Sequence, residues 1–370
     1  TLLIKKRVIV VGGGLAGLIA ACQLAKNGHL VQLFEKKQYP FHRVCGEYVS
    51  NEVLDFLKRE NLFPETAHFP SISKFEFSDT KGNTVSMDLD LGGFGISRFL
   101  LDDFLANKAI QLGVELLQNK PVENINFNSD VFEVITQDQS SYEADFVIAA
   151  HGKRSKLDKV LNRPFIEKRS PYIGVKYHIR TDASKETVAL HNFKAGYCGL
   201  NAIEEEKFNL CYLGSRDELR KYGSIPEMEA QTLFKNPKLK EIFNSSDFLF
   251  EKPEVINEIN FEFKRPVENH VLMAGDAAGL ITPLCGNGMA MAIHSGKLAA
   301  EAIHRFDYRE EVEKNYQRNW NMNFSRRLRV GRVVQRLFGS ESASSFARFL
   351  LSDFPAIGKV IMKNTHGTPI

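Results

Sequence analysis

Hydrophobic runs of strand length and helix length follow one another at the start of the chain. Arg7–Val11 is a short, mostly β-branched run, which is typical of a buried parallel strand. Residues 15–27 have helical spacing, and Gly28 follows as the residue type that commonly ends a helix. Leu30–Phe34 is a second apolar run, and Glu35 comes directly after it. The pattern predicts a complete strand–helix–strand unit near the N-terminus.

Farther along, the pattern changes between alternating and helical spacing. Residues 70–97 alternate apolar and polar positions around Lys81-Gly82-Asn83, which predicts a hairpin, and residues 171–213 are also rich in strand-like segments. Further buried strands are predicted at 131–136, 146–150 and 271–274, with an extended segment at 257–264. Helical spacing covers 51–61, 99–112, 226–243, 288–304 and most of 308–370.

A strand-rich block interrupts the strand–helix pattern twice, so two domains are expected to interleave. We predict an α/β protein with a doubly wound, Rossmann-like domain, an interleaved antiparallel β-sheet domain and C-terminal helices. The Rossmann-like domain takes residues 1–66, 98–165 and 265–307, and the β-sheet domain takes residues 67–97 and 166–264. Residues 308–370 are predicted to form a separate helical segment.

Composition and charge exclude several classes of protein and partner. Of the 370 residues, 43% are hydrophobic and 25% are charged, as in ordinary globular proteins, and a net charge of +3 gives no reason to expect nucleic acid as a partner. The five cysteines are widely spaced without a CxxC pair, so we expect neither disulfides nor a metal site. The predicted strand–helix–strand unit explains the apolar N-terminal stretch better than a leader peptide does, and a cytoplasmic protein is expected.

The glycines after the first strand have the spacing of a dinucleotide-binding turn. Gly12, Gly14 and Gly17 let a pyrophosphate approach the backbone, and the following helix offers its N-terminal N–H groups to the phosphates. Glu35 lies 18 residues past Gly17, where a carboxylate accepts hydrogen bonds from a ribose and disfavours a 2′-phosphate. These features predict FAD or NAD rather than NADP. The predicted contact residues in this region are Gly12, Gly14, Leu15, Ala16, Gly17, Glu35 and Lys36.

A second glycine-rich motif favours FAD over NAD. The segment that starts at Val271 reads as a buried strand and continues through Gly275-Asp276 into a helix. Asp276 would lie over the same crevice as the first motif, where a carboxylate suits the polyol chain of an extended cofactor. The glycine-rich segment before the helix offers backbone N–H groups at a helix N-terminus. These groups can stabilise negative charge on a reduced flavin ring. The predicted contact residues here are Gly275, Asp276, Pro283, Gly286, Asn287 and Gly288.

Three motifs occur in the order typical of the flavoprotein superfamily built like p-hydroxybenzoate hydroxylase, which this chain resembles. They are the first glycine turn with Glu35, AHGKRS at 150–155 and GDAAG at 275–279. Within it, FHRVCGE at 41–47 is similar to the geranylgeranyl reductase branch. The resemblance implies that Asp276 contacts the ribityl chain and that Arg43 and Arg98 lie near the pyrophosphate. It also implies that Cys45 lies near the isoalloxazine ring and that Gly152 contacts the cofactor.

Other signatures of this superfamily are absent or incomplete. In the middle motif His151 stands where the family often has aspartate, which argues against direct use of NAD(P)H. The halogenases carry a WxWxIP signature that a single tryptophan, Trp320, does not supply, and Gly279 stands where the aromatic hydroxylases usually have histidine. The GYGW-like turn of the reductases is matched only in part, by Tyr197 and its neighbours in GYCGL.

We therefore expect an FAD-dependent oxidoreductase, in which the flavin carries the redox chemistry. The preferred reaction is reduction of C=C bonds in an apolar, polyprenyl- or polyketide-like substrate, with Cys45 and Tyr197 as the catalytic candidates for supplying a proton. The alternative is a flavin monooxygenase that hydroxylates an apolar or aromatic substrate, and a lesser alternative is a non-catalytic electron-transfer flavoprotein. The electron donor is left open between NADPH, a reduced ferredoxin and a flavin reductase.

The C-terminal segment contains a basic helix with apolar positions. Its arginines are Arg326, Arg327, Arg329, Arg332 and Arg336. Such a helix suits either peripheral contact with a membrane surface, where it would admit a lipid, or a solvated face that packs on the domain. Both interpretations are kept at this point.

Overall fold

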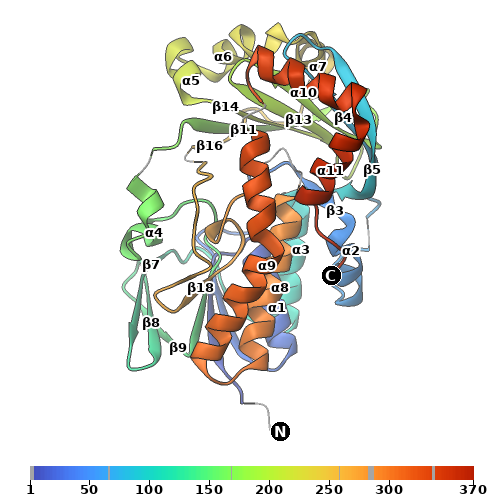
Figure 1. The fold of residues 1–370 in the computed structure, drawn as a ribbon. Coiled ribbons are helices and arrows are strands. Elements are labelled where there is room, and N and C mark those ends of the chain that lie inside the picture. The colour runs from blue at the N-terminus through green and yellow to red at the C-terminus, as the bar shows by residue number, and fades with distance from the viewer. Residues whose placement is uncertain (1–3, 66, 168, 258, 282–286, 336–337) are drawn as a thin grey trace.

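A parallel sheet at the base of the molecule carries the predicted Rossmann-like unit (Figure 1). The computed structural model describes residues 4–65, 67–167, 169–257, 259–281, 287–335 and 338–370. The sheet has the strand order β17-β18-β10-β1-β2-β6, and all its pairs are parallel except β17 with β18. Its strands are β1 (Arg7–Val11), β2 (Leu30–Phe34), β6 (Glu115–Leu117), β10 (Phe146–Ala149), β17 (Val267–Glu268) and β18 (Val271–Met273). The predicted strands at 7–11, 30–34, 146–150 and 271–274 are confirmed.

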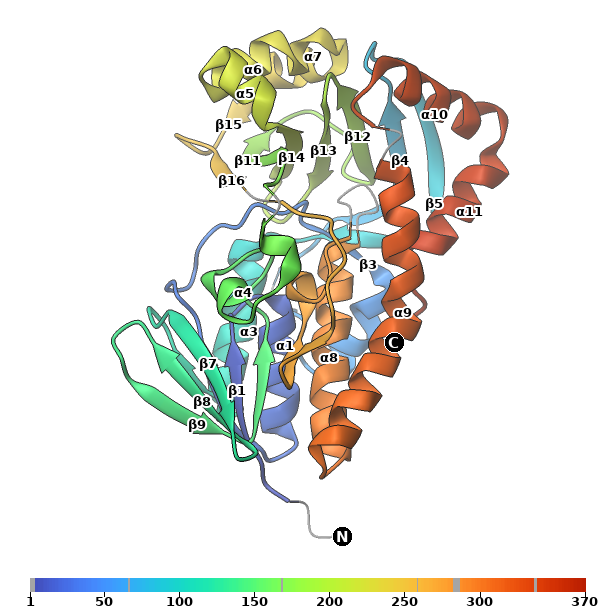
Figure 2. The same ribbon diagram turned by 60° about the vertical axis from the view of Figure 1, so that its left-hand side comes forward.

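Helices and a small sheet cover the two faces of this parallel sheet, as Figure 2 shows. On one side α1 (Leu15–Lys26) packs against α3 (Arg98–Gln111) and α8 (Gly288–Arg305). On the other side lies a three-stranded sheet of β7 (Val122–Asn128), β8 (Val131–Thr136) and β9 (Ser141–Ala144). The shorter helices α2 (Leu54–Arg59) and α4 (Lys156–Val160) flank this layer. The doubly wound architecture is confirmed. Apolar β1 and the mostly buried α1 form its centre.

A nine-stranded sheet forms the upper layer of the molecule. Its order is β15-β11-β14-β13-β12-β4-β5-β3, with β16 paired to β11, and its pairs are antiparallel except β12 with β4. The strands are β3 (Tyr48–Ser50), β4 (Ser71–Ser78), β5 (Thr84–Gly95), β11 (Tyr172–Arg180), β12 (Thr187–Phe193), β13 (Gly196–Ala202), β14 (Phe208–Ser215), β15 (Asp247–Phe248) and β16 (Glu254–Asn257). The hairpin predicted at 81–83 joins β4 to β5.

The two faces of the nine-stranded sheet have different neighbours, because successive side chains point to opposite sides. One face is covered by α5 (Arg216–Tyr222), α6 (Ile225–Gln231) and α7 (Pro237–Ser245), and Cys198 and Tyr212 share a core with Met228 there. The opposite face, with Leu190 and Tyr197, points toward the layer that contains the parallel sheet. The site described below lies between this face and the parallel sheet.

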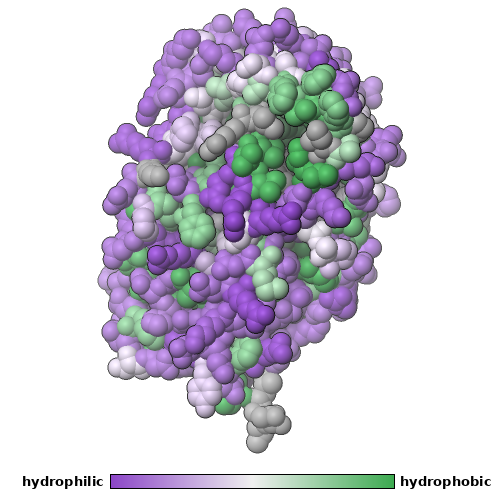
Figure 3. Space-filling model, in the orientation of Figure 1, coloured by the Kyte–Doolittle hydropathy of each residue, from purple (hydrophilic) through white to green (hydrophobic). Residues whose placement is uncertain are grey.

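Three C-terminal helices join the two layers, which confirms the helical prediction for 308–370. They are α9 (Arg309–Gln335), α10 (Glu341–Asp353) and α11 (Pro355–Thr365). Helix α9 packs along α8, and α10 packs against β4 and β5. Hydrophobic side chains gather over α10 in the space-filling view (Figure 3), and this helix exposes Phe346 and Phe349.

The arginines of α9 have different environments. Arg327 is buried and donates to both carboxylate oxygens of Glu52, at 3.0 and 3.2 Å. This buried ion pair fixes α9 to the segment around Glu52. Arg326 and Arg329 are exposed and Arg332 is half-buried, whereas Arg336 follows α9 and lies outside the described residues. No helix among the described residues has the length and apolar character needed to cross a membrane. Peripheral membrane contact through this helix stays a prediction.

Two segments differ from the sequence-based expectation. The segment 257–264 was predicted as extended. In the structure β16 ends at Asn257, and residues 259–265 form no helix or strand. The short strand β3 was not predicted, and it pairs with β5 although it lies within residues 1–66. A three-residue strand gives too short an alternation to be recognised in sequence, and its partner is about 45 residues away along the chain. The division of the chain into domains stays a prediction.

Candidate active site

The glycine turn after β1 brings three chain segments into close backbone contact. Gly12 has a φ of +103°, and a Cβ at this position would lie 2.4 Å from the carbonyl oxygen of Ala150 at the end of β10. A Cβ on Gly17 would lie 2.0 Å from the carbonyl oxygen of Gly12, so the first turn of α1 packs directly on the glycine turn. The first turn of α1 contains no acidic residue, and its N–H groups are suited to a phosphate.

Glu35 is buried at the end of β2 and lines the cavity that opens beside the glycine turn. Its Oε2 accepts hydrogen bonds from the backbone N–H of Gly13 at 2.9 Å and from Nη2 of Arg43 at 3.1 Å. Its Oε1 accepts from the N–H of Lys37 at 3.0 Å. A carboxylate has about four acceptor positions, so these contacts orient Glu35 and leave capacity for a ribose hydroxyl.

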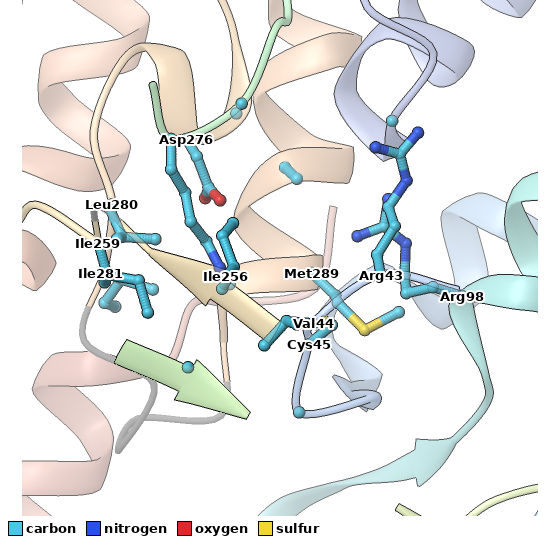
Figure 4. A pocket seen from close by; sticks show the side chains of 18 of the residues that line it. Arg43, Val44, Cys45, Arg98, Ile256, Ile259, Asp276, Leu280, Ile281 and Met289 are labelled. Carbon is cyan, nitrogen blue, oxygen red and sulfur yellow. The ribbon is translucent and has the colours of Figure 1, made fainter. Parts of the chain in front are cut away.

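Arg43 and Arg98 lie on one wall of the cavity, across from Asp276 (Figure 4). Both are held by Asp102 of α3. Arg98 donates from Nε and Nη2 to the two carboxylate oxygens at 2.7 and 2.8 Å, and Arg43 donates from Nε at 2.8 Å. Asp102 was not predicted from the sequence, although it lies four residues after Arg98, which is the spacing of a side-chain ion pair on a helix.

Asp276 occupies the wall formed after β18. Residues Gly275–Ala277 form a short 3₁₀ helix, η4, and the N–H of Gly275 donates to Oγ of Ser295 at 2.7 Å. The buried Lys264 donates to the carbonyl oxygens of Lys153 and Asp276 at 2.8 and 2.9 Å, which joins the AHGKRS and GDAAG segments. Burial lowers the pKa of Lys264 to about 8.

The loop that contains Cys45 is fastened to the nine-stranded sheet by polar side chains of β11 and β14. Nδ2 of Asn209 donates to the carbonyl oxygens of Cys45 and Gly46, at 3.1 and 2.9 Å. Nζ of Lys176 donates to the carbonyl oxygen of Arg43 at 3.0 Å. These contacts place the Cys45 loop at the boundary between the two layers, where the cofactor site meets the space below the sheet.

Glu47 ends this loop as a fully buried carboxylate. Lys176 donates to its Oε1 and Nε2 of His178 lies 2.7 Å from its Oε2, while the N–H of Arg98 donates to Oε1 at 2.8 Å. Burial alone would raise the pKa of Glu47, but Lys176 and His178 lower it to about 2. The sequence did not predict Lys176, His178 or Asn209 at this site, because nothing in their local sequence indicates which face of the sheet meets the loop.

A single cavity of about 1040 Å³ extends from the glycine turn past Cys45 to the underside of the nine-stranded sheet. Its far part is lined mainly by hydrophobic side chains from β4, β5, β12, β13, β14 and the C-terminal helices. We call this part the apolar chamber; its lining residues include Phe75, Phe77, Met87, Leu89, Val188, Leu190, Tyr197, Leu213, Phe338, Ala347, Leu350 and Leu351.

Cys45 and Tyr197 line the same cavity at different depths. Asn201 of β13 donates from Nδ2 to the carbonyl oxygen of Glu47 at 3.3 Å, so this end of β13 lies against the Cys45 loop. Tyr197 is four residues before Asn201 along the same strand, which corresponds to roughly 13 Å. Cys45 therefore lies where the loop meets the apolar chamber, and Tyr197 lies farther along the sheet.

The structure brings most of the predicted site residues to this cavity. Those that line it are Gly12, Gly14, Leu15, Ala16, Glu35, Lys36, Arg43, Cys45, Arg98, Gly152, Tyr197, Gly275, Asp276 and Gly288. Gly17 packs against Gly12 instead, and Asn287 is buried before α8 without being among the lining residues. Pro283 and Gly286 lie outside the described residues. The glycine turn, the oriented Glu35 and the opposed Asp276 and Arg98 fit the two halves of FAD.

Comparison with curated proteins identifies distant relatives. The chain is 25% identical over 357 residues to conditioned medium factor receptor 1 of Dictyostelium discoideum, which covers 86% of this chain and 68% of that protein. It is 27% identical over 343 residues to digeranylgeranylglycerophospholipid reductase of Methanocaldococcus jannaschii, which covers 85% of this chain and 81% of the reductase.

Solved structures share the whole fold at low sequence identity. A geranylgeranyl bacteriochlorophyll reductase-like protein from Thermoplasma acidophilum superposes with a TM-score of 0.77 and 20% identity, over 97% of this chain and 96% of that one. The flavin-dependent brominase Bmp2 superposes with a TM-score of 0.76 and 18% identity, over 97% of this chain and 92% of that one. These likenesses show that the two-layer architecture is shared with both of these proteins.

A family model described as FAD binding domain matches residues 5–304, which includes the glycine turn, the Cys45 loop, the nine-stranded sheet and η4. The match covers most of the chain and ends at the start of the C-terminal helices. The chain belongs to this FAD-binding family and is an FAD-dependent oxidoreductase.

Proposed function

We propose that this oxidoreductase reduces C=C bonds of an elongated apolar substrate that lies in the apolar chamber. The observation that carries the proposal is the continuity of the chamber with the cofactor site, because one cavity connects the glycine turn to the hydrophobic underside of the sheet. Such a chamber binds a hydrocarbon chain by burying apolar surface, and it keeps water away from the site of reaction. Bound FAD supplies the hydride for this reaction.

The chain itself supplies a proton and the position of the substrate. Reduction of a double bond adds a hydride to one carbon and a proton to its neighbour, so an acid is needed where the apolar chamber meets the cofactor site. Cys45 lies at this boundary, held by Asn209 through its backbone carbonyl. We assign proton delivery to the Cys45 thiol and contact with the substrate chain to Tyr197, which lies deeper in the chamber.

The relatives support a reductase, and the fold leaves one competing reaction. The Methanocaldococcus relative is named as a reductase of a digeranylgeranyl lipid, which is an apolar substrate of the kind the chamber suits. The fold likeness to a brominase favours oxygen chemistry as the alternative, in which the chain would act as a monooxygenase on an apolar or aromatic substrate. The two reactions differ in their need for an acid at Cys45.

Replacement of Cys45 by serine tests the proposal. Cys45→Ser keeps the shape of the side chain but raises the pKa of the acid, so anaerobic reduction of a polyprenyl substrate should slow by about 10²-fold, the usual contribution of a general acid. Turnover is followed by oxidation of the pre-reduced flavin on addition of substrate. Bound FAD should stay stoichiometric, and Cys211→Ser serves as the control for loss of a thiol from the same cavity.

Two outcomes would contradict the reductase proposal. In one, Cys45→Ser retains full anaerobic turnover. In the other, the wild-type protein oxidises the substrate only when oxygen is present and incorporates an oxygen atom into the product. The second result would favour the monooxygenase alternative directly.

A further inference from the structure

Helix α10 is apolar on two sides, and only one of them faces the protein. Ala347, Leu350 and Leu351 line the apolar chamber. On the second side Phe346 and Phe349 are 52% and 47% exposed, although both are large hydrophobic side chains. A helix with apolar residues on most of its surface is normally buried, so the exposed side of α10 indicates a partner outside the chain.

The exposed apolar side chains continue from α10 onto α11. Phe354 follows α10 directly and is exposed, and its ring centre lies 6.0 Å from that of Phe349. Val360 is exposed on α11. Figure 3 shows hydrophobic side chains gathered over these two helices on one face of the molecule. We call Phe346, Phe349, Phe354 and Val360 the exposed apolar patch.

Basic side chains accompany this patch. Helix α9 crosses the same face of the molecule and packs against α11 (Figure 1). The two helices expose four basic side chains, namely Arg326, Arg329, Lys359 and Lys363. Within the described ranges of the chain none of these four forms an ion pair, because the pairs of this region use Arg327 and Arg348. The sequence from 320 to 370 contains two acidic residues, Glu341 and Asp353.

These charges favour a lipid surface over a second copy of the chain as the partner. Two copies that met through the exposed apolar patch would bring the same unpaired cations close together, and like charges repel. A surface of anionic lipids instead attracts the arginines and lysines, while the phenylalanines enter the boundary between headgroups and acyl chains. Apolar and basic side chains on one face therefore have complementary partners in the same lipid layer.

We propose that α10 and α11 dock on an anionic lipid surface through the exposed apolar patch. The basic residues of α9 and α11 then contact the lipid headgroups, and the phenylalanines of α10 provide the apolar contact. Docking of this face needs neither bound substrate nor a particular reaction, so it extends beyond the proposed function.

The docked helices would separate the lipid from the apolar chamber by a single layer. Gly358 of α11 lies against the chamber, since a Cβ at this position would be 2.6 Å from Cε of Met87, a lining residue. The inner side of α10 lines the same chamber. An apolar substrate dissolved in the lipid thus has a short path to the chamber. This path rests on the proposed function, whereas the docking does not.

Removal of the phenylalanines tests the docking. FAD-loaded protein is mixed with vesicles of phosphatidylcholine and phosphatidylglycerol, and the bound fraction is measured by sedimentation of the vesicles. Combining Phe346→Ser with Phe349→Ser should lower the partition coefficient by at least about 10-fold, because two apolar side chains no longer leave water. The matched control combines Ile110→Ser with Leu112→Ser, which removes two exposed apolar side chains at the end of α3. This control should bind as the wild type does.

Removal of the arginines tests the charge contribution. Combining Arg326→Gln with Arg329→Gln should weaken binding to the anionic vesicles by about 5-fold for each arginine, the effect of one charge at such a surface. Binding to vesicles of phosphatidylcholine alone should be weaker in the wild type and unchanged by this substitution. Thermal unfolding without lipid checks that each variant keeps the fold.

The single tryptophan of the chain allows a measurement of depth. Trp320 is only 2% exposed, so brominated lipid should leave the fluorescence of the wild type unchanged. Phe349→Trp adds a tryptophan within the exposed apolar patch, and brominated lipid should quench its emission. An emission that is not quenched would place α10 outside the lipid layer.

Three further results would overturn the docking proposal. The wild type could fail to sediment with the anionic vesicles, or the phenylalanine variant could bind them as the wild type does. Alternatively, the wild type could form a dimer in the absence of lipid that the phenylalanine variant does not form, which would assign the patch to a second copy. All these measurements are made without substrate, so their outcome is independent of whether the protein reduces C=C bonds.

Discussion

Glu35 shows at the scale of one residue how the fold prepares a cofactor contact. Its carboxylate is almost completely buried and already accepts hydrogen bonds from two backbone N–H groups and from Arg43. The contacts hold the side chain in one orientation before any ligand binds, which lowers the conformational cost of binding. Its remaining acceptor capacity is therefore available for the adenosine ribose.

Glu35→Gln should weaken FAD binding by about 1–3 kcal/mol, because the amide cannot accept from Gly13, Arg43 and a ribose hydroxyl at once. The measurement is reconstitution of apoprotein with FAD, followed by flavin fluorescence. Glu115→Gln is the control, since Glu115 is exposed on β6 and accepts a hydrogen bond from Nε2 of Gln32. Unchanged FAD affinity in Glu35→Gln would remove Glu35 from the cofactor site.

At the scale of elements, the loop at 41–47 depends on the nine-stranded sheet for its position. The loop follows β2 in sequence, but its carbonyl groups and Glu47 are bound by Lys176 and His178 of β11 and by Asn209 of β14. Because the sheet holds both ends of the loop, the position of Cys45 relative to the cofactor site is a property of the contact between the two layers.

Glu47→Gln should destabilise the fold by about 3–5 kcal/mol, because it leaves the ammonium group of Lys176 buried without its counter-charge. Adding Lys176→Met to Glu47→Gln should recover part of this loss, since it removes the unpaired charge. Chemical and thermal unfolding of both single variants and the double variant measure the coupling. An exposed pair on α9, Lys314 with Glu310, is the control, and Glu310→Gln should change stability by less than about 1 kcal/mol.

The pair of Glu47 and Lys176 also predicts that the folded protein loses stability at acid pH. The pKa of Glu47 is about 2 in the folded protein, below its ordinary value of 4.5, so its contribution is complete above about pH 4.5 and is lost as the pH falls toward 2. The loss of stability over this range should be smaller in Glu47→Gln than in the wild type. An identical acid limb in both proteins would contradict the assigned ion pair.

At the scale of the whole molecule, two interleaved layers enclose one cavity. The parallel sheet provides the cofactor end, the nine-stranded sheet provides the roof of the apolar chamber, and α10 and α11 contribute part of its wall. Under the proposed function this cavity holds both cofactor and substrate, so the reaction would depend on the contact between layers that are each built from separated segments of the chain.

The electron donor is a prediction at this scale. The sequence contains one strand–turn–helix glycine motif, which is assigned to FAD, and His151 stands where the flavoprotein superfamily that the sequence resembles often has aspartate. We predict that NADPH reduces the bound flavin more slowly than about 10 s⁻¹, a median enzyme turnover. A reduced ferredoxin or a flavin reductase should do so faster. Anaerobic stopped-flow measurements with each donor check this, and the flavin released on denaturation should be FAD rather than FMN. Rapid reduction by NADPH alone would contradict the prediction.

The sequence by itself determined the features whose causes are local. The β-branched run before Gly12, the helical spacing of 15–27 and the carboxylate of Glu35 lie within one strand–helix–strand unit, whose geometry follows from backbone sterics and from the period of the apolar positions. Asp276 could be placed for the same reason, because the carboxyl ends of parallel strands meet at one edge of a sheet.

Only the tertiary structure decided what surrounds the Cys45 loop. Lys176 lies 129 residues from Glu47 in the chain, and its place on the cavity face of β11 depends on strand order and register, which local sequence does not encode. The presence of Cys45 and Tyr197 in one cavity follows from the same long-range packing. Motifs are read from neighbouring residues, whereas a cavity is formed by segments that meet only when the chain has folded.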